Sequence, residues 1–203
     1  MPAKYEDIQA RKAEKEVYIE TNHCFIKGFG WLLPRYIDPA QVGVIILKRE
    51  PEAVARSLYK INVTPFSQAG RDWIITPNVA EPTTPFPPEI SALKNTLYPI
   101  LSRTLMHRRI VQLFSSARLD KASFLKRYDL LWNLWYVKET YALGQLFLMR
   151  YPQVQVYEVS LEDLNYKQNV RKMLDHFGIQ APIGEKAERL IGTKTNLKQS
   201  YIR

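Results

Sequence analysis

The stretch VGVIILKREPEAVARSLYKI, residues 42–61, decides the fold of this chain. Its first half is a near-continuous apolar run, which is typical of a β-strand covered on both faces, as in parallel sheets. Pro51 then stands where a proline suits the first turn of a helix. Apolar residues continue at helical spacing as far as Ile61. The stretch therefore predicts a buried strand, a sharp turn and a helix.

Two polar residues of this stretch are candidates for binding an anion. Arg49 ends the strand and Ser57 lies inside the helix. In open α/β sheets, ligands bind at the carboxyl ends of the strands. A guanidinium beside a helix start offers a phosphate both a fork of donors and free N–H groups. The alternative is a salt-bridged arginine near Glu50 or Glu52 and an ordinary helix serine, but the combined pattern in its strand context favours a site.

Strands and helices alternate along the rest of the chain. The predicted strands are 17–25, 42–48 and 154–159, and the further predicted helices are 5–16, 92–114, 128–150 and 168–177. The helix 128–150 is apolar nearly all round, so we expect it to be largely buried. Ser160 and Asp163 have the spacing of a capping box. Alternation of this kind predicts an α/β fold in which helices flank a parallel sheet, built as one domain over residues 1–203.

Two segments differ in composition from the rest. Residues 62–99 are rich in proline and cannot form a long regular element. We expect an ordered excursion or lid there, because Phe66, Trp73 and Phe86 provide side chains that can pack; a disordered linker is the alternative. Residues 185–203 form a basic tail.

The composition limits the classes of partner. The chain has 203 residues, 46% of them hydrophobic, which suits one globular domain. Lys and Arg total 29 against 20 Asp and Glu, a net charge of +9 that favours anionic partners. Cys24 is the single cysteine, so we expect no intrachain disulfide and no metal site. The sequence shows no apolar signal core and no apolar run of about 20 residues, so we expect a cytoplasmic protein without a membrane span.

Several segments together resemble one enzyme family. LKREPEAVARSLY resembles the 3′-phosphate-binding segment of sulfotransferases that use 3′-phosphoadenosine 5′-phosphosulfate (PAPS), where a strand ends in Arg-Asp-Pro or similar and a serine follows in the helix. YIETNHCF resembles their upstream strand, which ends near a catalytic His or Glu. WYVKETYALGQLFLMRYPQVQVYEVSLEDL and QNVRKMLDHFGI resemble later segments of the same enzymes. The resemblance runs discontinuously over residues 17–179 and implies a P-loop nucleoside-triphosphate-hydrolase-like architecture.

The resemblance also implies roles for particular residues. His23 would be the general base, because its ordinary pKa lies near working pH, and Glu20 is the alternative base. The residues implied to bind PAPS are Arg49, Ser57, Lys194 and Lys198. The competing interpretations are a histidine bonded to backbone, a salt-bridged glutamate and solvated tail lysines. The implied reaction is transfer of a sulfuryl group to a hydroxyl or amine of a small-molecule or glycan acceptor.

The chain departs from the family at its start. Family members carry a Gly/Ser/Thr/Lys-rich loop that binds the 5′-phosphosulfate, and nothing in residues 1–20 fits it. GTKT at residues 192–195 follows no convincing strand and lacks the order of such a loop. We therefore expect an N-terminally incomplete sulfotransferase, either a fragment or a degenerate and inactive member. The alternative function is a non-catalytic nucleotide- or polyanion-binding or interaction protein.

Two further expectations concern partners. The aromatic residues lie in apolar helices rather than among Lys and Arg, so we expect no nucleic-acid binding. A sheet that lacks its first strand has a position that another chain could fill, so an oligomer is possible.

Overall fold

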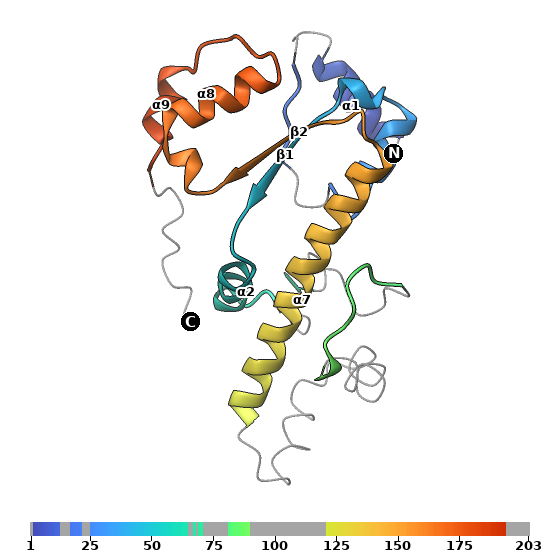
Figure 1. The fold of residues 1–203 in the computed structure, drawn as a ribbon, viewed down its shortest axis with the longest axis vertical. Helices are drawn as coiled ribbons and strands as arrows, with labels where there is room; N and C mark the ends of the chain where they lie inside the picture. Colours follow the sequence, from blue (N-terminus) through green and yellow to red (C-terminus); the bar gives the residue numbers. More distant parts are fainter. Residues whose placement is uncertain are drawn as a thin grey trace. The chain divides into compact units, whose positions relative to one another are not determined.

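The computed structural model describes residues 2–12, 17–21, 25–64, 67, 69–70, 81–89 and 121–193, and it has mixed α/β character (Figure 1). Its contacts divide the chain into two compact units. Unit 1 comprises residues 1–49 and 147–203, and unit 2 comprises residues 50–146. The expected single domain over residues 1–203 stays a prediction, and each unit is described by itself.

The sheet of unit 1 is formed by two parallel strands, β1 and β2 (Figure 1). The strands are β1 Gly43–Lys48 and β2 Gln155–Ser160. The register runs from Gly43 opposite Gln155 to Lys48 opposite Ser160. The predicted strands 42–48 and 154–159 and their parallel arrangement are thus confirmed. The carboxyl ends of both strands meet at one edge of the sheet.

The two faces of this sheet differ in burial. Val44 and Val156 lie opposite each other and pack into the core of unit 1. On the other face Ile45 and Leu47 are 44% and 45% exposed. The expectation of a strand covered on both faces is therefore wrong for β1, because a run of apolar residues does not determine what packs against it.

A neighbouring aromatic ring covers the start of β1 on this exposed face. A Cβ added at Gly43 would lie 2.8 Å from the ring of Phe177. The Phe177 ring also makes an edge contact with Tyr157 at 6.5 Å between centroids. Glycine at position 43 thus gives Phe177 the space to lie against the strand.

The core of unit 1 is built around Phe147, which is 1% exposed. Phe25 and Trp31 meet its ring edge-on, at centroid distances of 5.5 Å and 5.4 Å. A Cβ at Gly30 would lie 2.6 Å from the carbonyl oxygen of Phe25, so this turn requires glycine. The other elements before β1 are the helix α1 Pro2–Lys12 and the 3₁₀ helices Phe29–Trp31, Leu33–Arg35 and Pro39–Gln41.

Two sequence predictions fall in this region. The predicted helix 5–16 is confirmed as far as Lys12 by α1, and residues 13–16 lie outside the described residues. The predicted strand 17–25 is wrong for residues 17–21, which form no regular element. A strand needs a neighbouring strand for its backbone groups, and among the described strands β1 and β2 pair only with each other.

The segment after β2 forms a small helical module of its own. Its elements are the 3₁₀ helix η4 Asp163–Asn165, the helix α8 Lys167–His176 and the helix α9 Glu185–Leu190. Gly178 adopts φ +70° at the end of α8, and Ile179 N–H donates to the Leu174 carbonyl at 2.9 Å. These are features of a Schellman motif. The predicted helix 168–177 with its glycine stop is confirmed.

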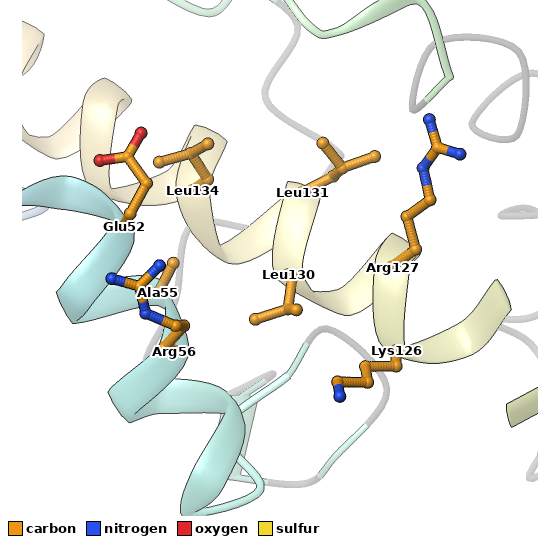
Figure 2. A pocket seen from close by; sticks show the side chains of 8 residues that line it. All are labelled: Glu52, Ala55, Arg56, Lys126, Arg127, Leu130, Leu131 and Leu134. Carbon is orange, nitrogen blue, oxygen red and sulfur yellow. The ribbon is translucent and has the colours of Figure 1, made fainter. Parts of the chain in front are cut away.

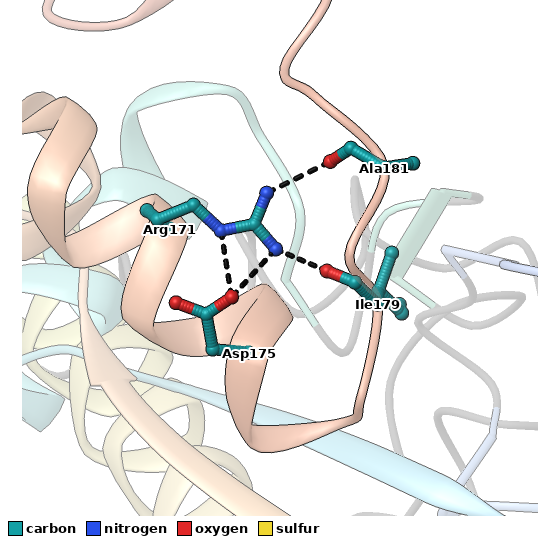
Figure 3. Close-up of polar contacts among 4 residues, drawn as sticks. All are labelled: Arg171, Asp175, Ile179 and Ala181. Atoms are coloured by element: carbon teal, nitrogen blue, oxygen red, sulfur yellow. Dashed lines mark hydrogen bonds and ion pairs between the residues drawn. The ribbon is translucent and has the colours of Figure 1, made fainter.

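Arg171 of α8 holds the chain that follows this helix (Figure 3). Its guanidinium donates to the carbonyls of Ala181, at 2.8 Å, and Ile179. The same group pairs with Asp175, one turn along α8. One planar fork of donors thereby fixes the return of the backbone against α8.

Unit 2 is built on two helices, α2 Pro51–Lys60 and most of α7 Lys121–Arg150 (Figure 1). α2 ends in a second Schellman motif, in which Asn62 adopts φ +56° and Val63 N–H donates to the Leu58 carbonyl. α7 confirms the predicted helix 128–150 and begins earlier. The predicted helix 92–114 lies outside the described residues.

The core of unit 2 is aromatic. Trp132 and Trp135 of α7 are 0% and 2% exposed. Phe86, from the proline-rich segment, stacks on both rings at centroid distances of 5.8 Å and 4.5 Å. Both tryptophans are therefore core residues of unit 2.

No helix among the described residues is both long enough and apolar enough to cross a membrane.

Candidate functional site

The candidate site begins at the edge where β1 and β2 both end. Lys48, the last residue of β1, lies opposite Ser160, the last residue of β2. The Lys48 ammonium forms a cross-strand ion pair with Glu158. Arg49, the next residue along the chain, is the cation that directly follows the end of β1. The Arg49 residue is exposed.

The loop after β2 is held by a reciprocal cap. Ser160 Oγ donates to Asp163 Oδ2 at 2.6 Å, and Asp163 N–H donates back to Ser160 Oγ at 3.0 Å. Asn169 of α8 donates to the Asp163 carbonyl at 3.3 Å. The predicted capping-box pairing of Ser160 and Asp163 is confirmed, although the helix that follows is a single 3₁₀ turn. Hydrogen bonds from Ser160, Asp163 and Asn169 thus hold the loop that follows β2.

The two residues predicted to bind the 3′-phosphate belong to different units. Arg49 is the last residue of the first part of unit 1, whereas Ser57 lies half-buried on α2 in unit 2. Each is thus placed on its predicted element, one after the strand and one in the helix. Their convergence on a single ligand stays a prediction.

The start of α2 carries two interacting carboxyl groups. Glu50 is the N-cap residue, Pro51 follows it and Glu52 lies in the first turn. A hydrogen bond between the two carboxyl groups raises the pKa of Glu50 and lowers the pKa of Glu52. Negative charge here complements the helix dipole and opposes a second anion at the same backbone N–H groups. Side-chain donors, rather than the end of α2, would therefore have to bind a phosphate.

Glu20, the alternative base, lies half-buried in the segment before the first glycine turn. Tyr18 Oη donates to Glu20 Oε2 at 2.7 Å. A hydrogen bond from Arg11 to Asp7 raises the pKa of Arg11, and the charge of Glu20 adds to this effect. Glu20 is thus within electrostatic range of α1. His23, Lys194 and Lys198 lie outside the described residues.

Part of the proline-rich segment packs against α7 and forms hydrogen bonds with it. Residues 81–89 are described, and Phe86 packs as expected, while Phe66 and Trp73 lie outside the described residues. Glu139 of α7, 1% exposed, accepts hydrogen bonds from the N–H groups of Thr83 and Thr84 at 2.8 Å and 2.5 Å. Two hydrogen bonds therefore hold residues 83 and 84 against α7, and the expected excursion or lid over residues 62–99 stays a prediction.

Two acidic residues of α7 were not singled out from the sequence. Glu139 is the buried acceptor just described, and Asp129 carries a buried oxygen that has no hydrogen-bond partner among the described residues. Burial raises the pKa of the Asp129 carboxyl to about 7. The sequence did contain a signal for both residues, namely an acidic residue inside a mostly apolar helix. Such a residue indicates a specific role, because a buried carboxylate is rare unless it is paired.

No family model matches this chain, and neither a curated protein nor a solved structure matches it. Among the described residues, no group of three or more His, Cys, Asp or Glu side chains could hold a metal ion.

Proposed function

We propose that this chain is a sulfotransferase-like protein that binds PAPS with Arg49 and Ser57. The observation that carries the proposal is the parallel pairing of β1 and β2, with Arg49 directly after β1 and the proline-started helix α2 following it. In α/β folds such an edge is where nucleotides bind. We further propose that the chain has the P-loop-like architecture of sulfotransferases.

Arg49 and Ser57 are the residues that we propose for the 3′-phosphate of PAPS. Arg49 is exposed and directly follows β1. A guanidinium fork matches two phosphate oxygens, and a serine hydroxyl adds a third donor. In this proposal the tail residues Lys194 and Lys198 add cationic charge around the same phosphate.

The chemistry requires one proton acceptor from the chain. PAPS supplies a sulfuryl group attached to a good leaving group. As the acceptor oxygen or nitrogen forms its bond to sulfur, its proton passes to His23, or to Glu20 as the alternative base. The sulfur–oxygen bond to the phosphate breaks, and adenosine 3′,5′-bisphosphate leaves with that electron pair. The acceptor is a hydroxyl or amine of a small molecule or glycan.

Arg49→Ala is expected to weaken binding of adenosine 3′,5′-bisphosphate about 10- to 100-fold, because a charge-assisted hydrogen bond contributes about 1.5–3 kcal/mol. Isothermal titration calorimetry on the full chain measures this. Arg35→Ala is the matched control, since Arg35 is an exposed arginine of unit 1 at a distant position in the sequence. Equal binding by the wild type and Arg49→Ala would reject the assignment of Arg49.

His23→Ala is expected to abolish sulfuryl transfer from radiolabelled PAPS and to leave binding of the bisphosphate unchanged. Glu20→Gln, assayed in parallel, distinguishes the two candidate bases. Unchanged transfer by His23→Ala would exclude that residue as the base. A wild-type chain that binds the bisphosphate but transfers sulfuryl to no acceptor would favour the second candidate, a non-catalytic nucleotide-binding protein.

A further inference from the structure

A groove lies between α2 and the first half of α7, entirely within unit 2 (Figure 2). Its volume is about 380 Å³, which is within the range of small-molecule sites. Both helices contribute lining residues. The lining residues are Glu52, Ala55 and Arg56 of α2 and Lys126, Arg127, Leu130, Leu131 and Leu134 of α7.

The floor of this groove is apolar. Ala55 is 3% exposed, and the three leucines of α7 are half-buried. Figure 2 shows Leu130 extending from α7 on the side of α2, between Arg56 and Lys126 in this view. Apolar side chains that are still partly open to water gain free energy when a hydrocarbon group covers them.

The rim of the groove is cationic. Arg56, Lys126 and Arg127 stand against one carboxylate, that of Glu52. Arg127 Nη2 lies 3.7 Å from Oε1 of Glu89 in the proline-rich segment, so Arg127 already has an ion-pair partner. The charge of Arg56 interacts with the carboxyl groups of Glu50 and Glu52, but among the described residues no carboxylate lies at ion-pair distance from Arg56 or Lys126. These two cations, one from each helix, can therefore bind one added anionic group.

The combination of floor and rim specifies the chemistry of a ligand. A purely polar anion would leave the leucines uncovered, and a neutral hydrocarbon would leave the cations without a counter-charge. We propose that the groove binds a small anionic amphiphile, a single alkyl chain or aromatic ring that carries a carboxylate or sulfate. The chain or ring covers Leu130 and Leu134, and the anionic group pairs with Arg56 and Lys126.

This groove is distinct from the proposed nucleotide site. Ser57 follows Arg56 directly, but it is turned by about 100° around α2 and does not line the groove. Binding at the groove therefore does not depend on the proposed sulfotransferase function. Failure of the bisphosphate to bind would not contradict amphiphile binding at the groove. Failure of an amphiphile to bind would likewise not contradict the proposed nucleotide site.

The test is a calorimetric titration of the full chain with octyl sulfate below its micelle-forming concentration. We expect saturable binding of one molecule per chain. Octyltrimethylammonium, which has the same alkyl chain and the opposite charge, is expected not to bind. Arg56→Gln combined with Lys126→Gln is expected to weaken octyl sulfate binding about tenfold, because both cations that pair with the sulfate are lost and ion pairs at a partly exposed site are individually weak.

Lys60→Gln is the matched control, because Lys60 is an exposed cation of α2 that does not line the groove. It should bind octyl sulfate as the wild type does. Equal binding of both amphiphiles, no saturable binding, or unchanged affinity in the double variant would overturn the proposal. Co-sedimentation with phosphatidylglycerol vesicles, without binding of monomeric octyl sulfate, would also overturn it in favour of a membrane surface.

Discussion

Replacing Trp135 by alanine is expected to lower the free energy of unfolding by about 3–5 kcal/mol, the usual cost of truncating a buried tryptophan. Trp135 is 2% exposed. The centroid of its ring lies 4.5 Å from the ring centroid of Phe86 and 5.0 Å from that of Trp132. Its indole N–H also donates to the Thr84 carbonyl at 2.9 Å. The substitution therefore leaves both a cavity and an unpaired carbonyl.

Urea denaturation followed by circular dichroism measures this loss. Leu146→Ala is the control on the same helix, because Leu146 is 44% exposed and should cost less than about 1 kcal/mol. Hydrogen exchange at Thr83 and Thr84 gives a local measure, since Glu139 still binds their N–H groups in the variant. A loss below about 1 kcal/mol for Trp135→Ala would show that the aromatic cluster does not support unit 2.

Asp129→Asn is expected to stabilise the chain at pH 8 by about 4 kcal/mol and to change its stability little at pH 4. Burial raises the pKa of this carboxyl to about 7 in the folded chain, whereas an unfolded aspartate titrates near pH 3.9, about three units lower. Between these values the folded state holds a proton that the unfolded state has lost. The stability of the wild type therefore falls as the pH rises through this window and levels off above it.

The measurement is a series of urea denaturations of both proteins between pH 4 and pH 8. The difference between the two free energies isolates Asp129, because the other titrating groups are common to both. Glu162→Gln serves as control, since Glu162 is exposed after β2 and its replacement should give a small difference at every pH. A difference for Asp129→Asn that does not change with pH would contradict the expected ionisation.

Local sequence patterns predicted the elements that depend on local chemistry. The glycine stop at Gly178 was readable because the left-handed conformation there suits glycine. The helix 128–150 was readable from its length and its lack of glycine or proline breaks, apart from Gly144. The strand β1 was readable as a short apolar run that ends in polar residues, and β2 from its valines and tyrosine between polar residues.

The features that the sequence did not predict depend on contacts between residues far apart in the chain. Residues 17–21 have the residue types of a strand, but strand formation depends on a partner elsewhere in the chain. The role of Glu139 depends on two amides about 55 residues away. For the candidate site, the sequence predicted the elements on which Arg49 and Ser57 lie. It did not predict that the two residues belong to separate units.

The surroundings of α7 within unit 2 have a consequence for how this protein can vary. Leu130 lines the groove, Asn133 donates to the Val63 carbonyl, and Glu139 holds the proline-rich segment. Each successive residue of an α-helix turns by about 100°. Inserting or deleting one residue between positions 130 and 139 would therefore turn Glu139 away from its partners while Leu130 stayed in place. The number of residues in this stretch is under tighter constraint than the identity of most of them.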